Sequence, residues 1–352
     1  MLWRHAASIA ALGVLAAAAG AQGAPNALRR LTMLDAKALE AIEHGDAIAV
    51  TLDAPDKTEI ATIGVVRLEV PRAFYLDHVK QLTGFLVSGT KTSSGIFGEP
   101  AKIDDVTSLT LDPADAKMLE KCQPLKCDVK LPASEMGKFH DELAKSHDPL
   151  PPADSLMRDW LVAYVNGYRA DSTEETVVYD DTKRSVRSSD AFRALVGEPL
   201  PPGLDAEPFT FMFSVPHSAR PPAVASRISW EMDRVPGLKP VLEVVERSTY
   251  ASPARPDASW MSTKLLYATH YFESQVDFLT VSDAPPAPAS GACYLIVLRR
   301  QKFDDLPSGG LFNIRGKAVK KLREALRATL ASTRVAIASA FADSPAPLPH
   351  AP

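Results

Sequence analysis

The last third of the chain, where four β-rich runs precede a long amphipathic segment, constrains the fold most strongly. Val, Ile, Thr and aromatic residues concentrate in the runs 241–250, 262–272, 276–281 and 293–299. These runs predict consecutive antiparallel strands. The last of them begins Cys-Tyr-Leu-Ile-Val-Leu and is apolar on both alternating faces, so we expect it to be covered on both sides.

A helix from about 315 to 340 supplies one of these covers. Val319, Leu322, Leu326, Leu330 and Val335 recur along the segment and are expected to form an apolar stripe. The opposite face is basic, and we expect it to be solvated, with transient contact to acidic lipid headgroups as the alternative. Together these patterns predict an α+β fold in which a curved antiparallel sheet packs against a long C-terminal helix.

The first 23 residues read as a secretory signal peptide. A short cationic head at Arg4 and His5 precedes the apolar run 6–19, and small residues follow at 19–23, where a signal peptidase would cut. Retention as a membrane anchor is the weaker alternative, because the run is shorter than the roughly 20 residues that a bilayer core requires. The chain is therefore expected to be exported to the periplasm or the extracellular space.

The composition argues for a soluble globular protein and against nucleic acid as a partner. Acidic residues outnumber basic ones, 43 to 39, and the charges are spread along the chain, so it lacks the electrostatic footprint of a nucleic-acid binder. No later run is long and apolar enough to span a membrane. We expect a single elaborated domain over 24–340, followed by a disordered Pro-rich tail over 341–352.

The three cysteines have different expected roles. Cys122 and Cys127 flank a Pro-containing loop, and in an oxidising compartment this spacing predicts a disulfide. A zinc site is disfavoured because no second Cys or His pair lies nearby to complete four ligands. Cys293 heads an apolar strand and is expected to be a buried thiol. No metal or cofactor is expected.

The first half of the chain alternates helices and strands. We expect a helix over 32–43, strands over 47–52 and 59–70, and a helix from Pro71 to about residue 86. The Gly- and Ser-rich segment 88–100 reads as a loop or a mobile hairpin.

The middle of the chain is less regular. Residues 134–235 read mostly as helix and coil, so they are expected to form an insertion or a cap, with a second domain as the alternative. Within this segment, 170–235 gives no confident pattern.

The order of elements resembles the helix-grip fold of the START-like lipid-binding superfamily. A strand leads through Val70 and Pro71 into a helix, and a run of antiparallel strands ends in a long helix; the resemblance covers 59–86 and 238–340. It implies a ligand cavity between the sheet and the last helix. The segment 134–235 departs from the pattern of a compact family member.

Polar and aromatic residues on two of the predicted strands are candidates for orienting a ligand in such a cavity. Around His270 the alternation of a strand places Tyr267, Thr269 and Tyr271 on one face and His270 on the other, so only one set can line an interior. A purely structural role for these residues is the alternative. The predicted ligand contacts are Tyr267, Thr269, His270, Tyr271, Tyr294 and Ile296.

Catalytic motifs are absent from the sequence, which contains no Gly-x-Ser-x-Gly elbow, phosphate-binding loop or His-Glu-x-x-His pair. The chain is therefore expected to bind rather than to catalyse: an exported soluble protein that holds an apolar or amphipathic small molecule, with lipid among the candidates. An exported hydrolase or isomerase that uses His270, His217 and Asp180 is the alternative. An envelope structural or interaction protein is a third reading, and the oligomeric state stays open.

Overall fold

The computed structural model describes residues 28, 30–31, 33–80, 82, 84–170, 177–214, 220–285, 291–306 and 313–344. The predicted signal peptide, residues 1–23, lies outside the described residues, as does most of the predicted tail.

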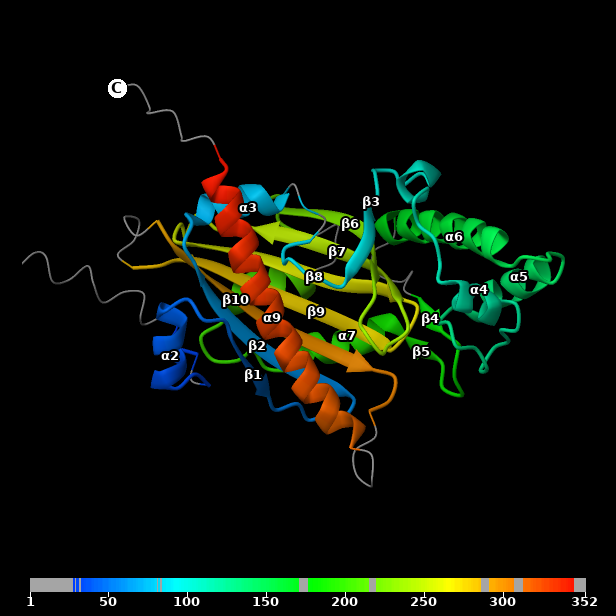
Figure 1. The fold of residues 1–352 in the computed structure, drawn as a ribbon, viewed down its shortest axis with the longest axis horizontal. Helices are drawn as coiled ribbons and strands as arrows, with labels where there is room; N and C mark the ends of the chain where they lie inside the picture. Colours follow the sequence, from blue (N-terminus) through cyan, green and yellow to red (C-terminus); the bar gives the residue numbers. More distant parts are fainter. Residues whose placement is uncertain are drawn as a thin grey trace, which may run out of the picture.

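An antiparallel sheet of eight strands dominates the described part of the chain (Figure 1). Together with the C-terminal helix it confirms the α+β class. From one edge to the other the strands are β1 (Ile48–Leu52), β2 (Glu59–Leu68), β10 (Cys293–Phe303), β9 (Phe272–Asp283), β8 (Ala258–Ala268), β7 (Val241–Tyr250), β6 (Val224–Asp233) and β3 (Lys91–Ile96).

The C-terminal helix α9 (Ile314–Ala342) crosses one side of this sheet diagonally, and we call that side the α9 face (Figure 1). Leu326 and Leu330 of the helix pack with Leu295 and Val297 of β10 in one buried apolar cluster. A Cβ atom added at Gly64 of β2 would lie 2.6 Å from Leu330 Cδ1. The glycine therefore lets the helix approach the sheet closely. A second helix, α3 (Arg72–Lys80), joins the same cluster.

In the described part of the chain, three groups of helices cover the opposite face. The first is α2 (Ala36–Glu43), and the second is α7 (Ser188–Gly197) with α8 (Ala206–Phe209) and the short π-helical turn η2 (Thr210–Ser214). The third group packs on Trp230 and Tyr267. It consists of η1 (Ile103–Val106), α4 (Pro113–Leu119), α5 (Ala133–Leu143) and α6 (Leu150–Ala170), and beside it lie the two short strands β4 (Val178–Tyr179) and β5 (Val186–Arg187).

Two strands of the sheet differ from the sequence expectation. β3 lies in the segment expected to be a loop or a mobile hairpin, and it pairs with β6 rather than within that segment. The sequence did not mark it as an edge strand of the sheet, because Lys-Thr-Ser-Ser-Gly-Ile has no apolar alternation. β6 lies inside the segment 134–235 that was expected to be an insertion or cap, so the last ten or so residues of that segment belong to the main sheet. The helix α9 also continues to Ala342, slightly beyond its expected end, and Val335 does not belong to the expected apolar stripe: it lies 180° around the helix from Leu326 and is exposed.

The cysteines have the predicted arrangement. Cys122 and Cys127 form a disulfide, and Cys293 is unpaired and buried. Burial raises the pKa of the Cys293 thiol to about 12, so it stays protonated. Within the residues that the structure describes, no helix has the length and apolar character needed to cross a bilayer.

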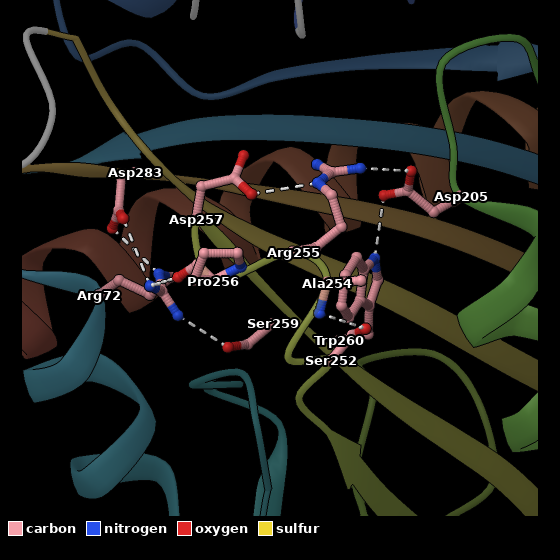
Figure 2. A network of polar contacts seen from close by, with 10 residues as sticks. All are labelled: Arg72, Asp205, Ser252, Ala254, Arg255, Pro256, Asp257, Ser259, Trp260 and Asp283. Carbon is pink, nitrogen blue, oxygen red and sulfur yellow. Dashed lines mark hydrogen bonds and ion pairs between the residues drawn. The ribbon is translucent and has the colours of Figure 1, made fainter.

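A polar network fastens α3 and the segment before α8 to the start of β8 (Figure 2). The guanidinium group of Arg72 donates from Nε to Asp283 at 3.0 Å and from Nη1 to Ser259 at 2.9 Å. Asp205, just before α8, accepts a hydrogen bond from Arg255 in the β7–β8 connection and another from Trp260 Nε1 in β8, both at 3.1 Å. These contacts connect segments that are far apart in the sequence.

Replacing Arg72 with Ala is expected to lower the free energy of unfolding by about 1.5–3 kcal/mol, because charge-assisted hydrogen bonds from a largely buried guanidinium are lost. Urea denaturation measures the loss. The control is Arg255→Ala, whose side chain is 41 % exposed against 19 % for Arg72. It should cost less than about 1 kcal/mol. An equal or smaller loss at Arg72 would contradict the role assigned to the network.

Candidate functional site

The predicted ligand residues lie in different parts of the fold. Tyr267 is buried against the third helical group, where its hydroxyl donates to the Lys130 carbonyl at 2.9 Å. Tyr294 and Ile296 lie in a different apolar cluster, beside α2, and the Tyr294 hydroxyl binds Glu43. These three residues therefore do not line one common cavity.

The other three predicted residues form the turn between β8 and β9. Thr269 Oγ1 accepts from the Leu242 backbone N–H at 3.0 Å, and the Tyr271 hydroxyl accepts from the Lys239 backbone N–H at 2.8 Å. His270 Nε2 lies 3.0 Å from Asp115 Oδ2, and both side chains are buried. Each of these polar groups has a protein partner.

The predicted residues and the predicted cavity beneath α9 do not coincide. Side chains alternate along β10, so Leu295 and Val297 face α9 while Tyr294 and Ile296 face the opposite side. The sequence could not reveal this, because that strand is apolar on both faces.

The residues named for a catalytic alternative are also dispersed. Asp180 accepts from the Ala133 backbone N–H at 2.9 Å, next to the first turn of α5, and His270 is paired with Asp115. His217 lies outside the described residues.

Beyond the edge of α9, a row of polar side chains crosses the α9 face of the sheet, and the apolar pair Val245 and Leu265 follows it along β7 and β8. Met261 of β8 and Leu279 of β9 are neighbours in the strand register and pack with α9. Two residues away along each strand, the register places this row of polar side chains side by side. Because residues two apart point to the same side, this polar row belongs to the α9 face. It consists of Arg299 on β10, Asp277 on β9, Thr263 on β8 and Arg247 on β7.

The charges of the polar row are paired with one another or with its neighbours. Arg299 binds Asp277 through two hydrogen bonds, 2.8 Å from Nε and 2.7 Å from Nη2. Arg247 lies 2.5 Å from the Glu231 carboxylate, and Lys91 lies 2.5 Å from the other oxygen of that carboxylate. Glu231 is only 2 % exposed, so it depends on these two cations.

Glu243 on β7 is the exception to this pairing. It stands directly opposite Glu231 in the register of β6 and β7 and is 8 % exposed, and none of the described residues hydrogen-bonds its carboxyl group. Burial, reinforced by the negative charges of Asp233 and Glu231, raises its pKa to about 8. At neutral pH Glu243 is therefore a carboxylic acid with a free O–H donor.

The chemistry of this face suits an uncharged polar group. The ion pairs cancel one another, and the neutral donor of Glu243 remains. Near the row, Gln301 donates to Gln275 at 2.7 Å, which adds another uncharged polar pair. An ester, amide or hydroxyl group can take a hydrogen bond from a protonated carboxyl without bringing a charge that needs a partner. No group of three His, Cys, Asp or Glu side chains within the described ranges is placed to hold a metal ion.

A separate pocket of about 240 Å³ lies at the start of β6, and three arginines line it. Arg220 is paired with Glu246 at 2.7 Å, and Arg227 donates to the Val79 carbonyl at the end of α3 at 3.1 Å. Arg169 donates to the Phe97 carbonyl at 3.3 Å. These guanidinium groups hold the walls of the pocket together through protein acceptors.

The sequence did not reveal Glu243, Glu231 or the polar row as a site. A signal was present, since charged residues inside strand runs such as Val-Leu-Glu-Val-Val-Glu-Arg are unusual. What the sequence lacks is the register. Only the pairing of β6 with β7 shows that Glu243 faces Glu231 rather than solvent.

Comparison with known proteins gives little further guidance. No protein-family model matches the chain, and no curated protein does. A solved structure with weak similarity is the crystal structure of Ara h 8.0201, with 9 % sequence identity and a TM-score of 0.18. The match covers 31 % of this chain and 66 % of that chain, just under two thirds of its length. Agreement this slight carries no argument about function.

Proposed function

We propose that the chain is an exported protein that binds an amphipathic small molecule with an uncharged polar group, such as a neutral lipid, on the α9 face. One observation carries the proposal. The apolar contact surface between α9 and the sheet adjoins a buried polar row, and beside that row lies the protonated, unpartnered carboxyl group of Glu243. In this helix-grip-like arrangement, a single amphipathic ligand contacts the apolar surface with its apolar part and the polar row with its polar group.

The polar group of the ligand accepts a hydrogen bond from Glu243, and its apolar part lies along Met261 and Leu279. Because Leu326 and Leu330 already pack tightly against the sheet, the edge of α9 has to shift outwards to admit the apolar part. The disulfide supports the exported location, since such bonds persist in oxidising compartments.

Binding of a monoacylglycerol with a fluorescent acyl chain tests the proposal. Saturable binding is expected for the unchanged protein, and Glu243→Leu should weaken it about tenfold because the hydrogen-bond donor is lost. The control is Glu59→Gln. Glu59 is another buried carboxyl, with a pKa raised by burial, but it lies on the opposite face near Arg300.

Two results would overturn the proposal: no saturable binding of the probe together with no lipid in native mass spectra of the purified protein, or equal weakening by both substitutions. A fatty acid with the same chain distinguishes the polar group. It should bind less tightly than the monoacylglycerol, because its carboxylate finds no unpaired cation in the polar row.

A second candidate is an exported hydrolase or isomerase. It is favoured by one observation: the protonated Glu243 stands opposite Glu231 in the strand register, and Glu231 is held between two cations. An acid near a carboxylate is a frequent acid–base arrangement. The same probe tests it. Release of the fluorescent fatty acid, abolished by Glu243→Gln, would favour catalysis over binding alone.

A further inference from the structure

The charges of this protein are unevenly distributed, and α9 holds an excess of positive charge. The whole chain has 39 basic and 43 acidic residues, whereas the sequence of α9 contains seven basic residues and a single acidic one, Glu324. The last helix therefore has a net positive charge, although the protein as a whole is slightly acidic.

Three of these cations point away from the sheet, and others lie on the flank of the helix beside them. We define the basic face of α9 as the five exposed residues Lys317, Lys320, Lys321, Arg323 and Arg327. At 100° per residue Lys317, Lys320 and Lys321 fall on the side away from Leu326 and Leu330, which pack on the sheet, and Arg323 and Arg327 lie on the flank of the helix. Within the part of the chain that the structure describes, none of the five forms an ion pair with a carboxylate.

The basic face of α9 is suited to contact with a flat surface. The basic face extends for about 15 Å along the helix, with small residues such as Ala325 and Ala328 between the cations, so the charges project from a surface without a groove. Val335 lies five turns beyond Lys317 on the same side, and it is 67 % exposed. An exposed apolar residue in line with unpaired cations is the pattern of a helix that lies on a lipid surface.

We propose that the outer side of α9 docks on a bilayer that contains anionic lipids, with the basic face against the headgroups and Val335 at the boundary of the acyl region. Each Lys or Arg near such a surface adds to the attraction, and the total falls as salt screens the charges. This inference is independent of the small-molecule site.

Cosedimentation with vesicles tests the docking. The unchanged protein should sediment with vesicles of phosphatidylcholine and phosphatidylglycerol in equal parts, remain in solution with pure phosphatidylcholine, and be released by high salt. The triple variant K317E/K320E/K321E should lose at least about tenfold in partitioning. Its control is K117E/K121E/K126E, which reverses three exposed lysines in and after α4 and leaves partitioning within about twofold.

Three outcomes would overturn the proposal: no sedimentation of the unchanged protein with anionic vesicles, equal sedimentation with both vesicle types, or equal losses in both triple variants. The last would show that only net charge matters. Circular dichroism of each variant confirms folding, and binding of the fluorescent monoacylglycerol in solution should be unchanged in K317E/K320E/K321E. A failure of docking is thereby distinguished from a failure of the small-molecule site.

Discussion

Replacing Glu243 with Gln is expected to raise the free energy of unfolding at neutral pH by roughly 2–4 kcal/mol. In the folded protein this carboxyl keeps its proton up to a pKa of about 8, whereas an ordinary glutamic acid releases it near 4.5. Between these values the folded state binds more protons than the unfolded chain, so the stability of the unchanged protein falls as pH rises. Gln has the same shape and cannot ionise, and this loss therefore disappears.

Urea denaturation over a pH series measures the effect. The difference between Glu243→Gln and the unchanged protein should be near zero below about pH 4.5, grow as pH rises, and become constant above about pH 8. A variant that is less stable than the unchanged protein at neutral pH would show that the carboxyl group has a stabilising partner. A difference that does not depend on pH would show that Glu243 does not titrate in this range.

Replacing Arg247 with Met is expected to lower the free energy of unfolding by about 3–5 kcal/mol, because it leaves the buried Glu231 carboxylate with Lys91 alone. Arg247 is 5 % exposed, so water cannot take the place of its guanidinium group. The same substitution also removes a 2.5 Å hydrogen bond to Ser229.

The double variant Glu231→Met/Arg247→Met separates the loss of a partner from the loss of packing. With both charges gone, no buried carboxylate is left unpaired, and Lys91, whose side chain is partly exposed, can turn to solvent. The double variant should recover most of the stability that Arg247→Met loses. If it is as unstable as the single variant, packing rather than charge pairing makes Arg247 important.

The elements of this fold were predictable where one face of a segment is consistently apolar. β7 to β10 and α9 have many buried side chains at the right period, so hydrophobic pattern alone places them. β3 is polar on both sides and sits at the sheet edge, where burial does not shape its sequence. Local pattern carries no information about such a strand.

The candidate site depended on information that no local pattern holds. Each strand around it contributes one or two charged residues, and those residues become partners only through the register between neighbouring strands. Arg299 and Asp277 are an example: their two hydrogen bonds require β9 and β10 to pair without a shift at that point. The disulfide was predictable because both of its cysteines lie in one short loop.

The position of β2 in the sheet determines the order in which the protein can be completed. β2 belongs to the first quarter of the chain, yet it pairs along its length with β10, so that Leu68 stands opposite Cys293. During synthesis, β1 and β2 are made long before β10 and α9, which cover and pair with them. Contacts this distant in sequence form slowly. Until β10 is made, one edge of β2 therefore has no partner, and the apolar cluster under α9 is completed only once the last helix has been made.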